Sequence, residues 1–101
     1  MTKQYTDTHI TVALTPGDPN TQSIVVEVTP RWREKMSAQG SDWSTDTLAA
    51  TLVHHKVRFS GWLLFDLDHV GQAVNTAPDG AHDWRKTVWE IHPITSMQIL
   101  P

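Results

Sequence analysis

The sequence predicts a mainly β domain, built as a small, largely antiparallel barrel with one or two short helices. Three observations favour this fold. Apolar and polar residues alternate in several short runs, as they do in half-buried strands. Two helical segments follow the second of these runs, and further strands come after them. The strands and helices do not have the regular alternation of parallel β-α-β units, which argues against a doubly wound sheet.

Length and composition limit the classes of protein. The 101 residues fit a single domain, 1–101. A hydrophobic share of 39% and a charged share of 19% exclude intrinsic disorder as the main state. The net charge of −3 excludes a generally cationic surface, and the lack of cysteine excludes disulfides and thiolate metal sites. No apolar stretch approaches the roughly 20 residues of a membrane span. We expect a soluble protein, either cytoplasmic or a mature exported domain.

The first two predicted strands form a hairpin. In residues 8–15, Ile10, Val12 and Leu14 alternate with more polar neighbours. The cluster at residues 16–20, Pro-Gly-Asp-Pro-Asn, is typical of a turn or short loop. The β-branched run at residues 23–29 then pairs with the first strand.

Two helices are predicted next. Thr29 is a suitable N-cap, Pro30 suits the first helical position, and Gly40 can end a short helix. A second helix is expected at about residues 45–54, with Ser44 as its N-cap. Trp43 precedes this cap and can pack against Leu48, four residues into the helix.

The second half of the chain predicts further β structure around a long loop. Residues 57–66 indicate a long strand, bent at Gly61, because glycine within a strand often marks a bulge. Residues 67–86 carry turn-forming residues and predict a loop. Residues 87–92 alternate again, Pro93 interrupts the ladder, and residues 94–100 resume as β structure.

These elements match an OB-like barrel better than other small β folds. An OB barrel has five strands with the helix after the third, whereas two strands precede the helices here. Either residues 3–5 begin a first strand or the first strand is missing. Only four strands are clear, and the resulting open edge favours self-association as a homodimer or the addition of a strand from a partner. In the alternative, Pro93 lets one bent strand serve two sheets and close the barrel within the monomer.

A resemblance supports the same fold. The string GWLLFDLDH at residues 61–69, Asn75-Thr76, and WRKTVWEIHPI at residues 84–94 resemble small bacterial OB-fold proteins. Few of those proteins are characterised, and they are labelled as nucleic-acid-binding by their fold. The resemblance implies an OB-like fold and an N-terminal export signal in many relatives. It also extends weakly to residues 7–10 and 26–28.

Carboxylates and histidines recur at a spacing of two residues. Asp7 and His9, and likewise Glu90 and His92, lie on one face of their strands because alternate residues point the same way. Asp66 and His69 can join them from a strand end. We expect a polar network in which Glu90 holds His9, His69 or His92. The alternative is a divalent metal site made by His9, Asp66, His69, Glu90 and His92.

Tryptophans beside basic residues form the second group of candidates. Five of the eight aromatic residues are tryptophan, and single-stranded nucleic acids stack on such rings beside cationic side chains. The ligand-binding candidates are Trp84, Arg85, Lys86, Trp32 and Arg33. In the alternative, Trp62 and Trp89 are core residues and Arg85 pairs with Asp66 or Asp83. Arg85 is expected to contact a ligand or to close the long loop.

The function expected from the sequence is therefore a non-enzymatic OB-like binding or accessory module. Single-stranded nucleic acid is the first expected ligand, and no resident cofactor is predicted. No glycine-rich phosphate loop, nucleophile elbow or zinc-protease helix is found, so an enzyme is not favoured. The alternatives are a metal-binding, hydrolase-like protein and a protein-assembly subunit. Replacing Glu90 is expected to lower stability more than replacing Arg85.

Overall fold

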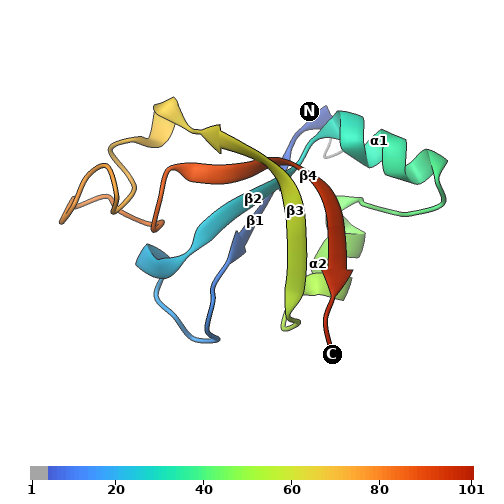
Figure 1. The fold of residues 1–101 in the computed structure, drawn as a ribbon, viewed down its shortest axis with the longest axis horizontal. Helices are drawn as coiled ribbons and strands as arrows, with labels where there is room; N and C mark the ends of the chain where they lie inside the picture. The colour runs from blue at the N-terminus through green and yellow to red at the C-terminus, as the bar shows by residue number, and fades with distance from the viewer. Residues whose placement is uncertain (1–4) are drawn as a thin grey trace.

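The computed structural model describes residues 5–101, which form one four-stranded sheet and two helices (Figure 1). The strands are β1 (Thr8–Val12), β2 (Ile24–Val28), β3 (Val57–Phe65) and β4 (Trp89–Ile99). Their order in the sheet is β1-β2-β4-β3, with antiparallel outer pairs and a parallel pairing of β2 with β4. The mainly β class is confirmed. The sheet of the described residues is mixed and is not closed into a barrel, and the expected strand at residues 3–5 falls mostly outside them.

The hairpin of β1 and β2 forms where the alternation predicts it. Its register runs from the pair Thr8 and Val28 to the pair Val12 and Ile24. β1 ends three residues earlier than expected, because the chain already turns at Thr15, whose carbonyl accepts from the amide of Asp18.

Both helices begin at the predicted caps. Helix α1 (Pro30–Ala38) starts after Thr29, whose hydroxyl accepts from a backbone amide of the first turn. Helix α2 (Thr45–Leu52) starts after Ser44, whose hydroxyl does the same. These caps satisfy amides that would otherwise have no partner inside the helix. α2 ends two residues before the predicted end.

The helices cover one face of the sheet and enclose the main core. The buried members come from β2, β4, α2 and the residue before the N-cap of α2: Val26, Val28, Trp43, Leu48 and Ile94. Partly buried apolar residues surround them: Ile10, Val12, Trp32, Met36, Leu52, Phe59, Ile91 and Met97. Trp43 and Leu48 thus share one cluster, as the predicted packing at the start of α2 requires.

An irregularity in the pairing of β3 with β4, at Gly61 and Pro93, divides this strand pair into two parts, and we call it the crease. The register shifts on both sides of Gly61, which pairs with Ile94, while Leu63 pairs with Ile91. A Cβ atom at Gly61 would collide with the carbonyl oxygen of Pro93 and lie 2.5 Å from Cγ2 of Ile91. Only glycine permits so close an approach of the two strands. The predicted bend at Gly61 and the interruption at Pro93 are therefore one feature, inside a continuous β4.

The helices lie toward one end of the sheet. Beyond the crease, the end of β3 and the start of β4 project away from both helices (Figure 1). The loop of residues 67–86 follows β3, beginning with a short 3-10 turn, Leu67–His69. Its end is fixed to the sheet, because the amide of Lys86 donates to the carbonyl of Ser23 at 2.8 Å. Among the described residues, no helix is long and apolar enough to cross a membrane.

A buried polar network as the candidate functional site

The sheet face opposite the core carries a line of histidines and carboxylates. On β2, Glu27 lies between Val26 and Val28, which both face the core, so its side chain points to the other face. His9 pairs with Glu27 across the hairpin, and Val26 pairs with Ile91. Strand alternation then places Glu90 and His92, the neighbours of Ile91, on the same face as Glu27.

These side chains contact one another directly. His9 Nε2 lies 2.6 Å from Glu27 Oε1. His92 Nδ1 lies 3.3 Å from Glu27 Oε2 and 3.0 Å from Glu90 Oε1, so it is shared by two carboxyl groups. The other nitrogen of His92, Nε2, lies 3.2 Å from Asp7 Oδ2. The face therefore holds three carboxyl groups around one imidazole.

Arg85 extends the network to the end of β3. Its side chain is only 1% exposed, and its Nη2 donates to Glu90 Oε2 at 3.1 Å. Its Nη1 donates to Asp66 Oδ2 at 3.3 Å, and its Nε donates to the carbonyl of Thr87 at 2.7 Å. Asp66 in turn contacts His69 Nδ1 at 2.5 Å. The network thus runs from an exposed histidine on β1 to a partly exposed histidine after β3.

Burial and mutual proximity shift the pKa values of the two central glutamates in opposite directions. Burial, followed by a hydrogen bond with Glu90 and the charges of Glu90, Asp7 and Asp66, raises the pKa of Glu27 to about 9. Burial also acts to raise the pKa of Glu90, but hydrogen bonds from Glu27 and His92 and the Arg85 guanidinium outweigh it. The pKa of Glu90 is therefore lowered. The two carboxyl groups titrate as a coupled pair in which the proton favours Glu27 and the negative charge favours Glu90.

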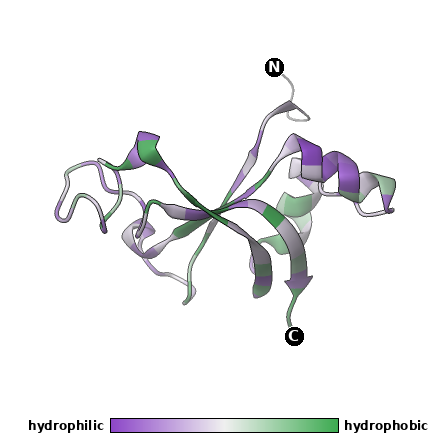
Figure 2. Ribbon diagram, turned by 45° about the horizontal axis from the view of Figure 1, so that its top comes forward, coloured by the Kyte–Doolittle hydropathy of each residue, from purple (hydrophilic) through white to green (hydrophobic). Residues whose placement is uncertain are grey.

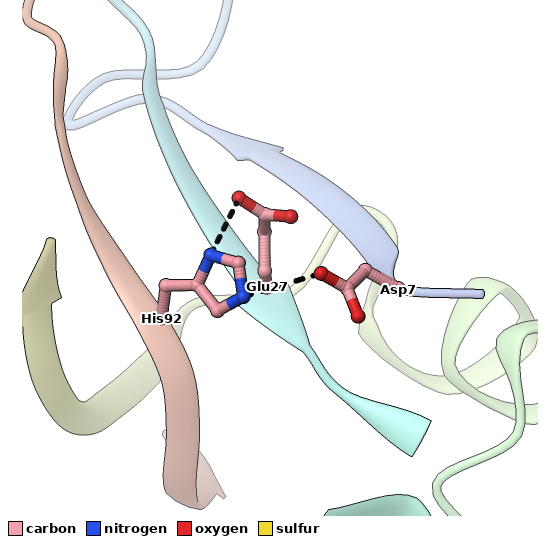
Figure 3. A group of neighbouring side chains, drawn as sticks. All are labelled: Asp7, Glu27 and His92. Atoms are coloured by element: carbon pink, nitrogen blue, oxygen red, sulfur yellow. Dashed lines mark ion pairs between the residues drawn. The ribbon is translucent and has the colours of Figure 1, made fainter. Parts of the chain in front are cut away.

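Asp7, Glu27 and His92 have the geometry of ligands around one cation (Figure 3). One candidate ligand atom from each of the three lies within 4.8 Å of the other two. Figure 3 shows the Glu27 carboxyl group at one ring nitrogen of His92 and the Asp7 carboxyl group at the other. Glu27 comes from β2, His92 from β4, and Asp7 immediately precedes β1.

The five predicted network residues, His9, Asp66, His69, Glu90 and His92, all belong to the polar network. Glu90 contacts His92, as one of the expected pairings requires. The five do not form one group of convergent ligands, because Asp66 and His69 are joined to the others only through Arg85. Sequence reasoning missed Glu27 as a member. Its signal was a single acidic residue inside the apolar run Val25-Val26-Glu27-Val28, where a charge needs a partner.

The predicted ligand-binding residues lie in two places. Arg85 is buried between carboxylates that flank the long loop, so it closes this loop, and the alternative pairing with Asp66 is confirmed. Trp84 is partly buried, donates from Nε1 to Gln72 Oε1 at 2.7 Å and lies against Arg85, whereas Lys86 is exposed.

On α1, Trp32 packs against the core and lies under the ammonium group of Lys35. Arg33 is buried and donates to the carbonyl of Thr6 and the hydroxyl of Thr8. Both predicted arginines are thus engaged within the chain.

Two tryptophans that the alternative interpretation placed in the core are exposed. Trp62 is 70% exposed and Trp89 is 46% exposed. Trp89 shares the core-side face of the sheet with Ile91, but it lies on the part of β4 that projects beyond the helices. Strand alternation gave its face correctly, and the lack of a covering helix leaves it exposed.

Comparisons with protein-family models, with curated proteins and with solved structures find no match to this chain.

Proposed function

We propose that this chain is a non-enzymatic, OB-like module that assembles with a second copy of itself through the projecting end of β3 and β4. The order of elements supports the OB-like plan. The helices lie between β2 and β3. In a five-stranded OB barrel the helix follows the third strand, so β1 to β4 correspond to the second to fifth strands of that barrel.

The observation that carries this proposal is an exposed apolar surface beyond the crease, which we call the ribbon surface. Its members are Trp62, Leu63, Leu64, Leu67 and Trp89. Leu63 is 73% exposed, and the ring of Phe65 lies edge-on to Trp89 at 5.1 Å. The turn after β3 also carries hydrophobic residues, in contrast to the hydrophilic α1 (Figure 2). Exposed apolar residues gathered in one part of a fold are typical of interaction sites.

Three successive exposed apolar residues, Trp62 to Leu64, point to both sides of β3. A strand that is apolar on both faces is usually covered on both. The described residues of one chain leave it uncovered, so a partner that lies along the strand accounts for the pattern.

The open edge of β3 favours a second copy as the partner. β3 is the last strand in the sheet order, so its outer edge has no neighbour among the described strands. Residues 59–65 contain no charged side chain. Two copies of β3 can therefore pair antiparallel about a two-fold axis without like-charge repulsion. Many natural edge strands avoid such pairing with lysine or proline, and residues 57–65 contain neither.

Nucleic acid is supported less well by the same surface. Arg85 and Arg33 make their contacts within the chain, and the ribbon surface lies beside Asp66 and Asp68. Stacking of bases on Trp62 would therefore lack the cationic groove that usually accompanies it.

Light scattering of the purified chain at micromolar concentration tests the proposal. We expect a mass near twice 11.4 kDa, and we expect Leu63→Lys to reduce it to 11.4 kDa. Leu14→Lys is the matched control, because Leu14 is also highly exposed but lies in the loop after β1. A mass of 11.4 kDa at every concentration contradicts the proposal. In that case, binding of a single-stranded oligonucleotide that weakens steeply with salt would favour the nucleic-acid function instead.

A further inference from the structure

We infer that Asp7, Glu27 and His92 bind one divalent transition-metal cation, of which zinc and manganese are the representative probes. This site lies on the face opposite the main core and is independent of the ribbon surface. Its donors are one imidazole nitrogen and two carboxylate oxygens, a set that suits both ions, with water in the remaining positions.

The distances agree with a shared ion. Zinc bonds to nitrogen and oxygen ligands are about 2.0 to 2.2 Å long, so two ligands of one ion lie at most about 4.4 Å apart. The three candidate ligand atoms already lie within 4.8 Å of one another, and His92 Nε2 is 3.2 Å from Asp7 Oδ2. Glu27 Oε2 lies 3.3 Å from the other ring nitrogen, Nδ1, so the Glu27 carboxyl group turns toward Nε2 to complete the coordination.

A second observation, outside these three residues, orients the histidine for a ligand. His92 Nδ1 lies 3.0 Å from Glu90 Oε1, and Glu90 is itself held by Arg85. With the proton on Nδ1, the ring donates to Glu90 and directs the lone pair of Nε2 toward Asp7. Histidines that bind metals commonly have this carboxylate partner on the other nitrogen.

Charge also favours a cation at this position. Arg85 compensates Glu90 and Asp66, but its guanidinium does not reach Asp7 or Glu27. Within residues 5–101, the ion-pair partners of those two carboxyl groups are His9 and His92. A divalent ion supplies positive charge between these two carboxyl groups.

The site is anchored and accessible at the same time. The Glu27 side chain is 5% exposed, whereas those of Asp7 and His92 are 32% and 24% exposed. A cation can therefore enter from solvent past Asp7 and bind against the fixed carboxyl group of β2.

Titration calorimetry of the full chain, produced without a histidine tag and treated with a chelator, tests the inference. With zinc or manganese chloride we expect one ion per chain and a rise in the melting temperature. Asp7→Asn and His92→Gln should each weaken binding at least tenfold. Asp7 is exposed, and an unchanged circular dichroism spectrum confirms that its variant is folded.

His69→Gln is the matched control. His69 is also paired with a carboxylate, Asp66, but lies at the far end of the network. Its variant should bind the metal as the parent chain does. The inference is overturned if neither ion saturates the parent chain, if both ligand variants bind unchanged, or if His69→Gln loses binding to the same extent.

Discussion

The Arg85 guanidinium donates to the Glu90 carboxylate across 3.1 Å, and both side chains are almost completely buried. Arg85 comes from the end of the long loop and Glu90 from β4, so this pair fixes the loop to the sheet. It also keeps Glu90 ionised next to the protonated Glu27. Arg85 therefore has a structural role, since it attaches the end of the loop of residues 67–86 to β4.

Replacement of Arg85 should therefore be more harmful than replacement of Glu90, the reverse of the order expected from the sequence. Arg85→Met leaves the buried Glu90 and the partly buried Asp66 without their cation, which should cost about 3 to 5 kcal/mol. Glu90→Gln keeps a hydrogen-bonding group and should cost about 1 to 3 kcal/mol. Urea unfolding of the two variants measures both values. A cost below 1 kcal/mol for Arg85→Met would show that the pair is dispensable.

The stability of the metal-free chain should fall as the pH rises from about 4.5 to about 9. The pKa of Glu27 is raised from 4.5 to about 9, so in this range the folded chain keeps a proton that the unfolded chain has lost. The free energy of unfolding then decreases with pH. The titratable groups that face Glu27 are His9, His92, Asp7 and Glu90.

Glu27→Gln isolates this contribution, because glutamine does not titrate. In a chelating buffer, its free energy of unfolding should change less with pH over the same range. Denaturant unfolding of both chains at several pH values provides the comparison. Equal slopes for the parent and Glu27→Gln would contradict the raised pKa of Glu27.

Gly61→Ala should destabilise the chain by about 1 to 3 kcal/mol, because the added methyl group would force β3 away from β4. It would meet the carbonyl oxygen of Pro93, which belongs to the backbone and cannot rotate aside. Gly71→Ala is the control, since a Cβ at Gly71 meets no atom within 4 Å. In thermal unfolding, Gly61→Ala should have a clearly lower melting temperature than Gly71→Ala. Equal melting temperatures would show that the two strands do not approach closely at Gly61.

Ile94→Ala should cost about 2 to 5 kcal/mol, since Ile94 is fully buried in the main core. Trp89→Ala should cost less despite the larger side chain, because nearly half of Trp89 is exposed in the single chain. Unfolding below the concentration of self-association is the appropriate measurement. A larger loss for Trp89→Ala would indicate that its exposed ring is covered in solution.

Local patterns predicted the elements of this fold well. The Thr29 and Ser44 caps, the hairpin of β1 and β2 and the bend at Gly61 all depend on neighbouring residues in the chain, which the sequence displays directly. Closure of the sheet depends on which strands meet, and alternation does not encode this. The mixed, open sheet could not be deduced from strand counting.

The candidate site was predicted in part for the same reason. The spacing of Glu90 and His92 showed that they share a face, but it could not show that Asp7 and Glu27 approach the same imidazole from other strands. The place of Arg85 was ambiguous, since a basic residue beside a tryptophan fits a ligand site as well as a buried ion pair. Burial decided between them, and burial is a property of the whole fold.

The close contact of Gly61 with the β4 backbone separates positions where substitutions affect folding from positions where they affect recognition. On one side of it lie the helices and the core, which determine whether the chain folds. On the other side lies the ribbon surface, whose exposed side chains contribute little to that core. Substitutions that alter what the ribbon recognises can therefore accumulate without loss of the folded state, provided that position 61 remains without a side chain.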